Sequence, residues 1–248
     1  MSFEGRRALV TGGAGGIGLA TGRILRDGGA SLALLDREVD ALRVAADPLG
    51  ALAVVADVRE EAQVRDAVDL ATNELGGQID LLVNAAGIYR IAPMLDMDVS
   101  EWDEVLGINL RGSWLIAREV AQGLIAAGVP GSIVNISSTA GLVADGEEPA
   151  AHYSDSKAGV IALTRQMAVE WGRHGIRANA VCPGVIDTPM LRLMDHPDVG
   201  RRYLDDFVPL RRLGMPEEVG ALIAFLASDE ASYITGVAVP IDGGATSI

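Results

Sequence analysis

The stretch Thr11-Gly-Gly-Ala-Gly-Gly-Ile-Gly18 decides the fold of this 248-residue chain. It lies between the apolar run Arg7–Thr11 and the helical pattern Ile17–Asp27. Glycines at a strand-to-helix turn let the backbone approach a pyrophosphate closely, and the first N–H groups of the helix are unpaired donors for it. Two registers fit, Gly13-x-Gly15-x-x-Gly18 and Gly12-x-x-x-Gly16-x-Gly18. The stretch therefore predicts a dinucleotide site, although a tight turn without a ligand has the same composition.

A carboxylate follows this turn at a meaningful distance. Asp36 ends the second apolar run, Ser31–Asp36, where its oxygens can accept hydrogen bonds from the ribose hydroxyls of an adenosine. The alternative is that Asp36 caps the helix that comes next. Because the acid and the glycine turn occur together, the pattern favours a cofactor site.

Short apolar runs alternate with longer amphipathic runs along the whole chain. The runs are apolar throughout, as expected for strands that are covered on both faces. Strands are predicted at Arg7–Thr11, Ser31–Asp36, Leu52–Ala56, Ile79–Asn84, Ser132–Ser137, Arg177–Cys182 and Val237–Ile241, and helices at Ile17–Asp27, Val39–Ala46, Glu60–Glu74, Ser100–Ala127, Tyr153–Arg173 and Glu217–Ala227. Ser100, and Pro216 with the acids after it, supply helix start signals. We expect a single α/β domain over residues 1–248, doubly wound and Rossmann-type, with a central parallel sheet of about seven strands.

Composition limits the possible partners. The formal net charge is −14 and the acids are dispersed, which argues against nucleic acids and anionic membranes. The single cysteine, Cys182, excludes an internal disulfide and fits a reducing compartment. His152, His174 and His196 lack metal-ligand spacing, so no metal site is expected. No run approaches the roughly 20 apolar residues of a membrane span, and no signal peptide precedes the first strand, so the prediction is a soluble cytoplasmic protein.

A second motif, Tyr153-Ser-Asp-Ser-Lys157, places a phenol and an ammonium group four residues apart. On a helix both side chains lie on one face, one turn from each other. A nearby positive charge lowers the pKa of a tyrosine below its usual value of about 10, so the phenol could exchange a proton near neutral pH. The motif predicts an acid/base centre, although the same spacing occurs by chance on many solvated helices.

Taken together, these motifs resemble those of the classical short-chain dehydrogenases/reductases, and the resemblance runs essentially from end to end. It is carried by Thr11-Gly-x-x-x-Gly-Ile-Gly18, Asp57-Val58, Asn84-Ala-Ala-Gly87, Asn109, Ser138, Tyr153-x-x-x-Lys157, Pro183-Gly184 and Asp242-Gly-Gly244. The resemblance selects the second glycine register and implies that an alcohol and a ketone are interconverted by hydride transfer with a nicotinamide cofactor. Two features depart from the family pattern: a longer, acidic segment between Ser138 and Tyr153, and Asp155 in place of a small residue.

The resemblance implies four catalytic residues. Tyr153 would be the general acid/base that exchanges a proton with the substrate oxygen. Lys157 would lower the pKa of Tyr153 and bind the nicotinamide ribose. Ser138 would hydrogen-bond the reacting oxygen, with the neighbouring Ser137 as its competitor. Asn109 would hold a water that relays protons between Lys157 and solvent; the residue by itself suggests only a polar position inside a helix.

Cofactor contacts are implied at the carboxyl ends of the strands, where open α/β sheets bind ligands. The residues are Gly12, Gly16, Ile17, Gly18, Asp36, Asp57, Val58, Asn84, Gly87, Tyr153, Lys157, Pro183, Ile186 and Thr188. NAD is expected rather than NADP, because the Asp36 carboxylate would repel a 2′-phosphate. Arg37 is the counter-argument, since its guanidinium could reach that phosphate.

Two segments predict the substrate side of the site. Residues 189–212 combine apolar side chains such as Met190, Leu191 and Met194 with charges, and we expect them to form a substrate lid rather than a helix that only covers the core. Asp145, Glu147 and Glu148 lie in the segment that would border the mouth, where they would repel anionic thioesters. A small neutral secondary alcohol, sugar or polyol is therefore the predicted substrate.

Two other functions stay open. One is a 3-oxoacyl-carrier-protein reductase that uses NADPH, and the other is a non-catalytic NAD-binding sensor or scaffold. The complete set of Asn109, Ser138, Tyr153 and Lys157 argues against the second, because a sensor needs no acid/base. A homotetramer is expected, with Glu101–Ala127 and Tyr153–Arg173 as paired interface helices.

Overall fold

The computed structural model describes residues 1–144, 149–191, 195 and 197–247. At its centre lies a parallel sheet of seven strands in the order β3-β2-β1-β4-β5-β6-β7. The strands are β1 Arg7–Thr11, β2 Ser31–Asp36, β3 Leu52–Val55, β4 Leu81–Asn84, β5 Gly131–Ile136, β6 Ile176–Pro183 and β7 Ala238–Ile241. The strand order reverses between β1 and β4, which is the position where doubly wound sheets open a crevice for a ligand.

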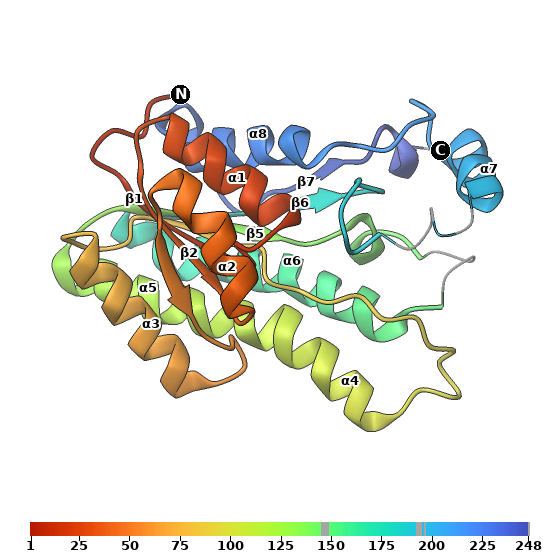
Figure 1. Ribbon diagram of the computed structural model, residues 1–248, viewed down its shortest axis with the longest axis horizontal. Coiled ribbons are helices and arrows are strands. Elements are labelled where there is room, and N and C mark those ends of the chain that lie inside the picture. The colour runs from red at the N-terminus through yellow and green to blue at the C-terminus, as the bar shows by residue number, and fades with distance from the viewer. Residues whose placement is uncertain (145–148, 192–194, 196, 248) are drawn as a thin grey trace.

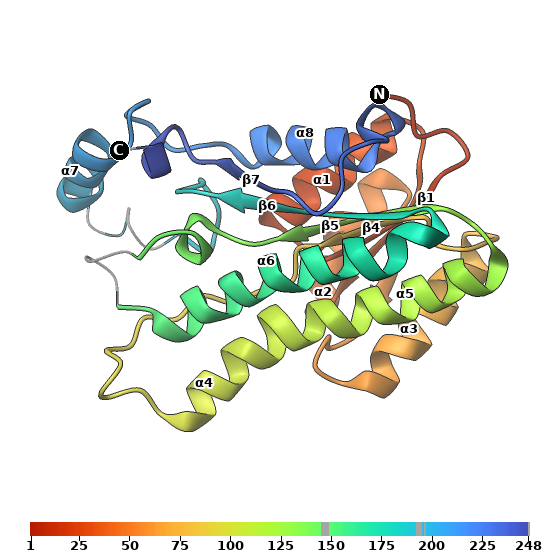
Figure 2. The same ribbon diagram turned by 180° about the vertical axis from the view of Figure 1, so that it is seen from behind.

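Helices cover both faces of this sheet (Figures 1 and 2). On one face lie α1 Gly16–Asp27, α2 Val39–Ala46 and α8 Pro216–Ala227, and on the other lie α3 Glu61–Glu74, α5 Ser113–Ala127 and α6 Ala151–Trp171. Two further helices, α4 Val99–Leu106 and α7 Pro197–Phe207, extend toward one end of the molecule. No helix in the described ranges is both long and apolar enough to cross a bilayer.

Each helix layer has its own apolar core. Leu9, on β1, packs with buried residues of α3 and α5, whereas Val10, the next residue, packs with those of α1 and α8. Successive side chains of a strand point to opposite faces, so a strand that is apolar throughout serves both cores. The predicted doubly wound α/β fold is confirmed, and the strand ends differ from the predicted ones by two residues at most.

Three local expectations need correction. The helix predicted at Ser100–Ala127 is interrupted by a π-helical segment, Gly107–Gly112. It begins at Val99 with Asp98 at the N-cap, so the start signal assigned to Ser100 was wrong. Helix α7 was not among the predicted helices, whereas Pro216 does open α8, where the Glu218 carboxylate accepts a hydrogen bond from the N–H of Met215.

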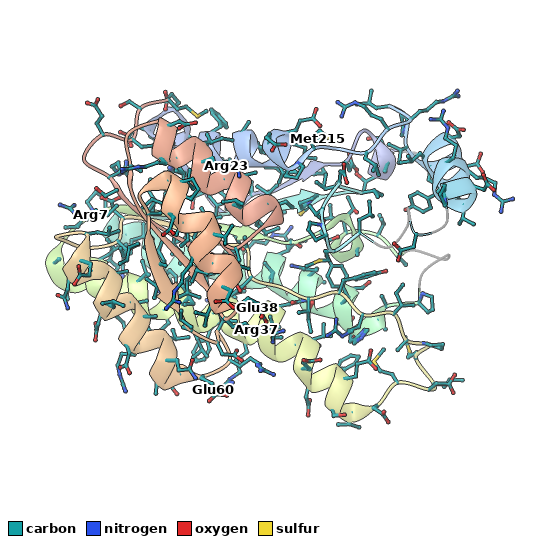
Figure 3. All side chains as sticks on the ribbon, in the orientation of Figure 1. Arg7, Arg23, Arg37, Glu38, Glu60 and Met215 are labelled. Atoms are coloured by element: carbon teal, nitrogen blue, oxygen red, sulfur yellow. The ribbon has the colours of Figure 1, made fainter. Side chains whose placement is uncertain are left out.

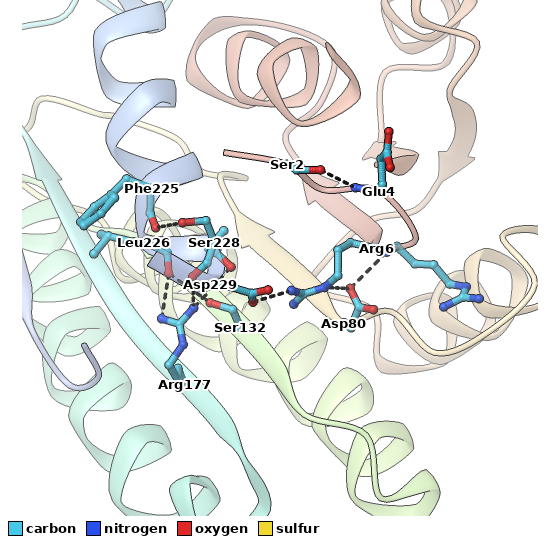
Figure 4. Close-up of polar contacts among 12 residues, drawn as sticks. Ser2, Glu4, Arg6, Asp80, Ser132, Arg177, Phe225, Leu226, Ser228 and Asp229 are labelled. Atoms are coloured by element: carbon cyan, nitrogen blue, oxygen red, sulfur yellow. Dashed lines mark hydrogen bonds and ion pairs between the residues drawn. The ribbon is translucent and has the colours of Figure 1, made fainter. Parts of the chain in front are cut away.

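Polar contacts tie the structure together at the amino ends of the strands (Figure 4). Arg6, just before β1, lies 3.1 Å from Asp80 and 3.0 Å from Asp229, so one guanidinium joins two carboxylates. Arg177, on β6, donates hydrogen bonds to backbone carbonyls at the end of α8 and just after it, including those of Leu226 and Ser228. These contacts satisfy carbonyls that a helix end leaves unpaired. The amino edge therefore has a structural role, and the predicted site residues lie at the carboxyl edge.

Candidate active site

A cavity of about 490 Å³ opens at the carboxyl ends of the strands. Most of the predicted cofactor and catalytic residues line it: Gly12, Gly16, Ile17, Gly18, Asp36, Asp57, Val58, Gly87, Ser138, Tyr153, Lys157, Pro183, Ile186 and Thr188. Asn84 and Asn109 are not among its lining residues. One cavity thus brings together the glycine turn after β1 and the Tyr–Lys pair on α6.

The glycine turn has the backbone geometry of the register that the family resemblance selects. Gly12 and Gly16 have φ angles of 65° and 53°, in the left-handed region where glycine is favoured. A Cβ on Gly12 would lie 2.8 Å from the Ala85 carbonyl oxygen, and one on Gly18 would collide with the carbonyl of Gly12. A Cβ on Gly15, by contrast, would have no heavy atom within 4 Å. The open space beside Gly15 at the start of α1 fits a pyrophosphate, so the residues present suit a dinucleotide.

Asp36 is held in place on both sides by backbone donors. Its Oδ2 accepts a hydrogen bond from Ala14 N at 3.2 Å, and its Oδ1 accepts one from Glu38 N at 3.2 Å. The N-cap residue of α2 is Glu38, so the alternative of Asp36 as the helix cap is wrong. Arg37 pairs with Glu38 at 3.2 Å, and both side chains lie near the carboxyl end of β2 (Figure 3). The part of the cavity after β2, where the adenosine is expected, therefore carries the carboxylates of Asp36 and Glu38 and the guanidinium of Arg37.

The carboxylate of Asp57 follows β3 and also lines the cavity. Arg59 donates to both of its oxygens, at distances down to 2.6 Å. This hydrogen bonding to Arg59 lowers the pKa of Asp57 against the opposing effect of burial. Asp57 is consequently a fixed, ionised carboxylate at the wall.

Ser138 and Tyr153 meet at the other end of the cavity. The Ser138 hydroxyl hydrogen-bonds the phenol of Tyr153, whereas the Ser137 hydroxyl donates to the Lys157 carbonyl at 2.8 Å. Ser138, and not Ser137, is therefore the hydroxyl beside the phenol. The ammonium of Lys157 lies 5.5 Å from the centroid of the Tyr153 ring and donates to the Ile136 carbonyl at 2.9 Å.

Burial dominates the ionisation of this pair. It raises the pKa of Tyr153, and the hydrogen bond from Ser138 opposes this only in part. It also lowers the pKa of Lys157 to about 8. The expectation that Lys157 lowers the pKa of Tyr153 was therefore wrong for this geometry, because both groups lose their hydration and an enclosed charge is costly.

Asn109 lies in the π-helical segment, and its carboxamide makes three hydrogen bonds within the protein. The Oδ1 atom accepts from Ile88 N at 2.8 Å, while Nδ2 donates to Ile88 O at 3.0 Å and to Ser156 Oγ at 3.0 Å. The amide thus holds the chain after β4 in place, and the water relay at Asn109 stays a prediction. Asn84 is buried below the cavity, where it donates to Ser113 O and to Asn135 Oδ1.

Two tyrosines that the sequence did not single out as site residues, Tyr89 and Tyr203, line the cavity. Tyr89 follows the Asn84–Gly87 motif, and its ring is perpendicular to that of Tyr153, with centroids 4.8 Å apart. Tyr203 comes from α7, inside the predicted lid, and Met190 and Leu191 of that lid also line the cavity. Leu193 and Met194 lie outside the described residues, as do Asp145, Glu147 and Glu148. Tyr89 could have been identified as a site residue from its position, two residues after the Asn84–Gly87 motif.

A glycine turn suited to a dinucleotide and a Tyr–Lys pair thus share one cavity in a Rossmann-type fold. Residues 12–246 match the family model described as enoyl-(acyl carrier protein) reductase. The chain is 44% identical over 256 residues to the oxidoreductase UcpA of Salmonella typhimurium, with 98% of this chain and 95% of the relative covered. The chain belongs to the short-chain dehydrogenase/reductase family, whose members use a nicotinamide cofactor.

Other relatives within the family act on different substrates. The chain is 38% identical over 248 residues to galactitol 2-dehydrogenase (L-tagatose-forming) of Cereibacter sphaeroides, covering 98% of this chain and 96% of the relative. It is 39% identical over 254 residues to the 3-oxoacyl-[acyl-carrier-protein] reductase FabG of Thermotoga maritima, covering 98% and 99%. A gluconate 5-dehydrogenase from Burkholderia cenocepacia, solved with NADP and tartrate, superposes with a TM-score of 0.93 at 35% identity, covering 100% of this chain and 97% of that one.

Proposed function

We propose that this protein is an NAD-dependent oxidoreductase that interconverts a small neutral secondary alcohol, sugar or polyol and the corresponding ketone. The observation that carries the proposal is the lining of the substrate end of the cavity. Besides Ser138 and Tyr153, the lining includes the hydroxyl-bearing Tyr89, Ser154 and Tyr203 and the apolar Ala140, Ala150, Met190 and Leu191. The charged lining residues among those described are Asp36, Arg37, Glu38, Asp57 and Lys157, and all but Lys157 follow β2 or β3.

This distribution of charge favours a neutral substrate. A carboxylate or phosphate on the substrate would call for a guanidinium near the reacting carbon, and the arginine in the described lining is Arg37, at the end of β2. Hydroxyl side chains and apolar walls instead suit a compound with several hydroxyl groups on a short carbon chain. The similarity to galactitol 2-dehydrogenase supports this class of substrate.

The proposed chemistry divides the work among three side chains. The nicotinamide ring, when bound, supplies the hydride acceptor or donor. Ser138 hydrogen-bonds the alcohol oxygen and orients the reacting carbon. Tyr153 accepts the hydroxyl proton during oxidation and returns it during reduction. Lys157, whose ammonium lies 5.5 Å from the centre of the Tyr153 ring, would hydrogen-bond the nicotinamide ribose and so hold the cofactor beside the phenol.

The choice of NAD rests on Asp36. A carboxylate fixed by two backbone N–H groups can accept hydrogen bonds from two ribose hydroxyls, and it would repel a phosphate at the same position. Arg37 is the residue that could reverse this preference, because its side chain lies next to that position and a solved relative binds NADP. Both cofactors therefore belong in the test.

The test is a substrate screen. Purified protein would be assayed with NAD and with NADP against neutral secondary alcohols, sugars and polyols, and in the reverse direction against acetoacetyl thioesters of coenzyme A and of acyl carrier protein. Faster turnover of neutral compounds with NAD is expected. If the thioesters with NADPH are the better substrates by a wide margin, the carrier-protein reductase, which the similarity to FabG favours, replaces this proposal.

The proposed enzyme is a cytoplasmic homotetramer. The expected interface helices carry exposed apolar side chains, including Trp114 and Ile125 on α5 and Val169 on α6. Closed symmetric assemblies bury such faces in most soluble oligomers. Light scattering at micromolar concentration tests the assembly, and a monomer would contradict it.

A further inference from the structure

We propose that Tyr89 positions Tyr153 and determines which substituent the reacting carbon can carry. Tyr89 lies in the segment after β4, outside the motifs that carry the family resemblance, and it lines the cavity. Its ring meets that of Tyr153 at an interplanar angle of 80°, with centroids 4.8 Å apart. Perpendicular aromatic pairs of this spacing attract one another, so the two rings restrict each other's movement.

A hydrogen-bond network fixes the backbone on both sides of this ring pair. The Asn109 carboxamide accepts from the N–H of Ile88 and donates to its carbonyl, which holds the residue directly before Tyr89. The same amide donates to Ser156 Oγ at 3.0 Å, and Ser156 Oγ donates to the Tyr153 carbonyl at 2.7 Å. Two segments that are far apart in the sequence are thus joined through one side chain. These hydrogen bonds fix the backbone near both rings and so maintain the contact between them.

The surroundings indicate what Tyr89 does for a substrate. The wall of the same cavity includes the small side chains Ala140, Ala150 and Ser154, while Met190 and Tyr203 come from the segment after β6. Tyr89 is therefore the large, ring-supported side chain beside the acid/base. A flat ring leaves space for a slim carbon chain and excludes a bulky or aromatic substituent. This inference rests on the proposed alcohol oxidation and deepens it.

The experiment compares two neutral alcohols with the same reacting centre, 2-butanol and 1-phenylethanol, which differ in an ethyl or a phenyl substituent. Tyr89→Phe keeps the ring and should leave the preference between the two alcohols within about twofold of wild type. Tyr89→Ala should raise the ratio of kcat/KM for 1-phenylethanol over 2-butanol by roughly tenfold or more, because pocket fit is worth about that factor. Tyr89→Trp should lower the same ratio.

Two readouts separate positioning from a merely structural role. In Tyr89→Ala, kcat for 2-butanol should fall roughly tenfold, the cost of a slightly misplaced acid/base, while the Kd for NAD and the thermal midpoint stay near wild type. The matched control is Tyr233→Ala, because Tyr233 is fully exposed and does not line the cavity, and it should change nothing.

The outcomes are distinct. If the wild type oxidises alcohols but the Ala and Trp variants keep the wild-type ratio, this inference is wrong and the proposed function stands. If the wild type oxidises no alcohol, both this inference and the proposed function are wrong. Should Tyr89→Ala unfold, the Tyr89→Trp and Tyr89→Phe pair decides, since an unchanged ratio in Tyr89→Trp would also overturn the inference.

Discussion

The two ends of the cavity are built in different ways. At the cofactor end, the turn between β1 and α1 acts through its backbone: Gly12 and Gly16 need positive φ angles, and Gly18 lacks room for a side chain. At the substrate end, side chains from separate segments meet, such as Tyr89 after β4, Ala140 after β5 and Tyr203 on α7. Backbone constraints leave short motifs in a sequence, whereas an assembly of distant side chains does not. The cofactor end is therefore shared across a family, and the substrate end can differ from member to member.

The largest effect is expected where the two ends meet. Tyr153→Phe removes the proton-exchanging hydroxyl and keeps the ring against Tyr89, so activity should fall by roughly 10²–10⁴-fold while the Kd for NAD changes little. Steady-state kinetics and a fluorescence titration with NADH would measure the two quantities. Near-normal turnover in this variant would show that the acid/base has been assigned to the wrong residue.

A methyl group at the cofactor end should have the opposite signature. Gly15 has an extended φ of −174°, which any residue can adopt, and its Cβ would meet no protein atom within 4 Å. Gly15→Ala should therefore keep the thermal midpoint but place a methyl group where the pyrophosphate is expected, which weakens NAD binding by roughly tenfold or more.

Gly172→Ala is the matched control for this variant. A Cβ at Gly172 also has no atom within 4 Å, but the residue lies after α6 and does not line the cavity. It should bind NAD as the wild type does. Equal NAD affinity in Gly15→Ala and Gly172→Ala would show that the glycine turn does not contact the cofactor.

The same contrast explains what the sequence could predict. The strands and most helices follow from local apolar patterns, and the prediction of the doubly wound fold was right. Helix α7 buries only Gly200 and Leu204, so its core-facing pattern is sparse, although Pro197 and Asp198 are start signals that could have indicated it. The π-helical break was not predictable from periodicity, because Asn109 reaches the Ile88 backbone, which is distant in sequence.

The candidate site shows the same limit. Spacing alone placed Tyr153 and Lys157 on one face of a helix, but the direction of the pKa of Tyr153 was predicted wrongly because burial is a property of the tertiary structure. The choice of Ser138 over Ser137 came from the family resemblance and not from local pattern, since both residues follow β5; the structure places the Ser138 hydroxyl beside the phenol.

A substitution of Asp36 should have a smaller effect than Tyr153→Phe or Gly15→Ala, and it should change the preference between NAD and NADP. In Asp36→Ala the repulsion of a 2′-phosphate and the acceptors for the ribose hydroxyls are both removed, so the ratio of kcat/KM with NAD to that with NADP should fall about tenfold, by roughly 1.4 kcal/mol. Arg37→Ala is the companion variant and should weaken NADP use alone. Comparable efficiency of the wild type with both cofactors would contradict the role given to Asp36.

Stability should also respond, through a residue that both ends of the cavity share. Lys157 is the only lysine in the chain, and burial lowers its pKa from 10.5 to about 8. Below pH 8 the folded protein must bury a charged ammonium that is solvated in the unfolded chain, so the full cost opposes folding. As the pH rises from 8 toward 10.5, the folded protein has lost this proton and the unfolded chain still holds it, so the cost fades.

Lys157→Met removes this cost together with the pH-independent hydrogen bond to the Ile136 carbonyl. The change in the free energy of unfolding that Lys157→Met causes should therefore be more favourable at pH 6.5 than at pH 9.5. The expected difference is about 2 kcal/mol, because one pKa unit corresponds to roughly 1.4 kcal/mol. For a domain of this size, about 2 kcal/mol corresponds to roughly 4–8 °C in the thermal midpoint. The shift of the midpoint from wild type to variant should differ by this amount between the two pH values, and thermal unfolding would measure it. The variant should also lose activity, because the side chain proposed to bind the nicotinamide ribose is gone. An identical midpoint shift at both pH values would mean that Lys157 keeps an ordinary pKa in the fold, and that the acid/base end of the cavity is better solvated than its burial indicates.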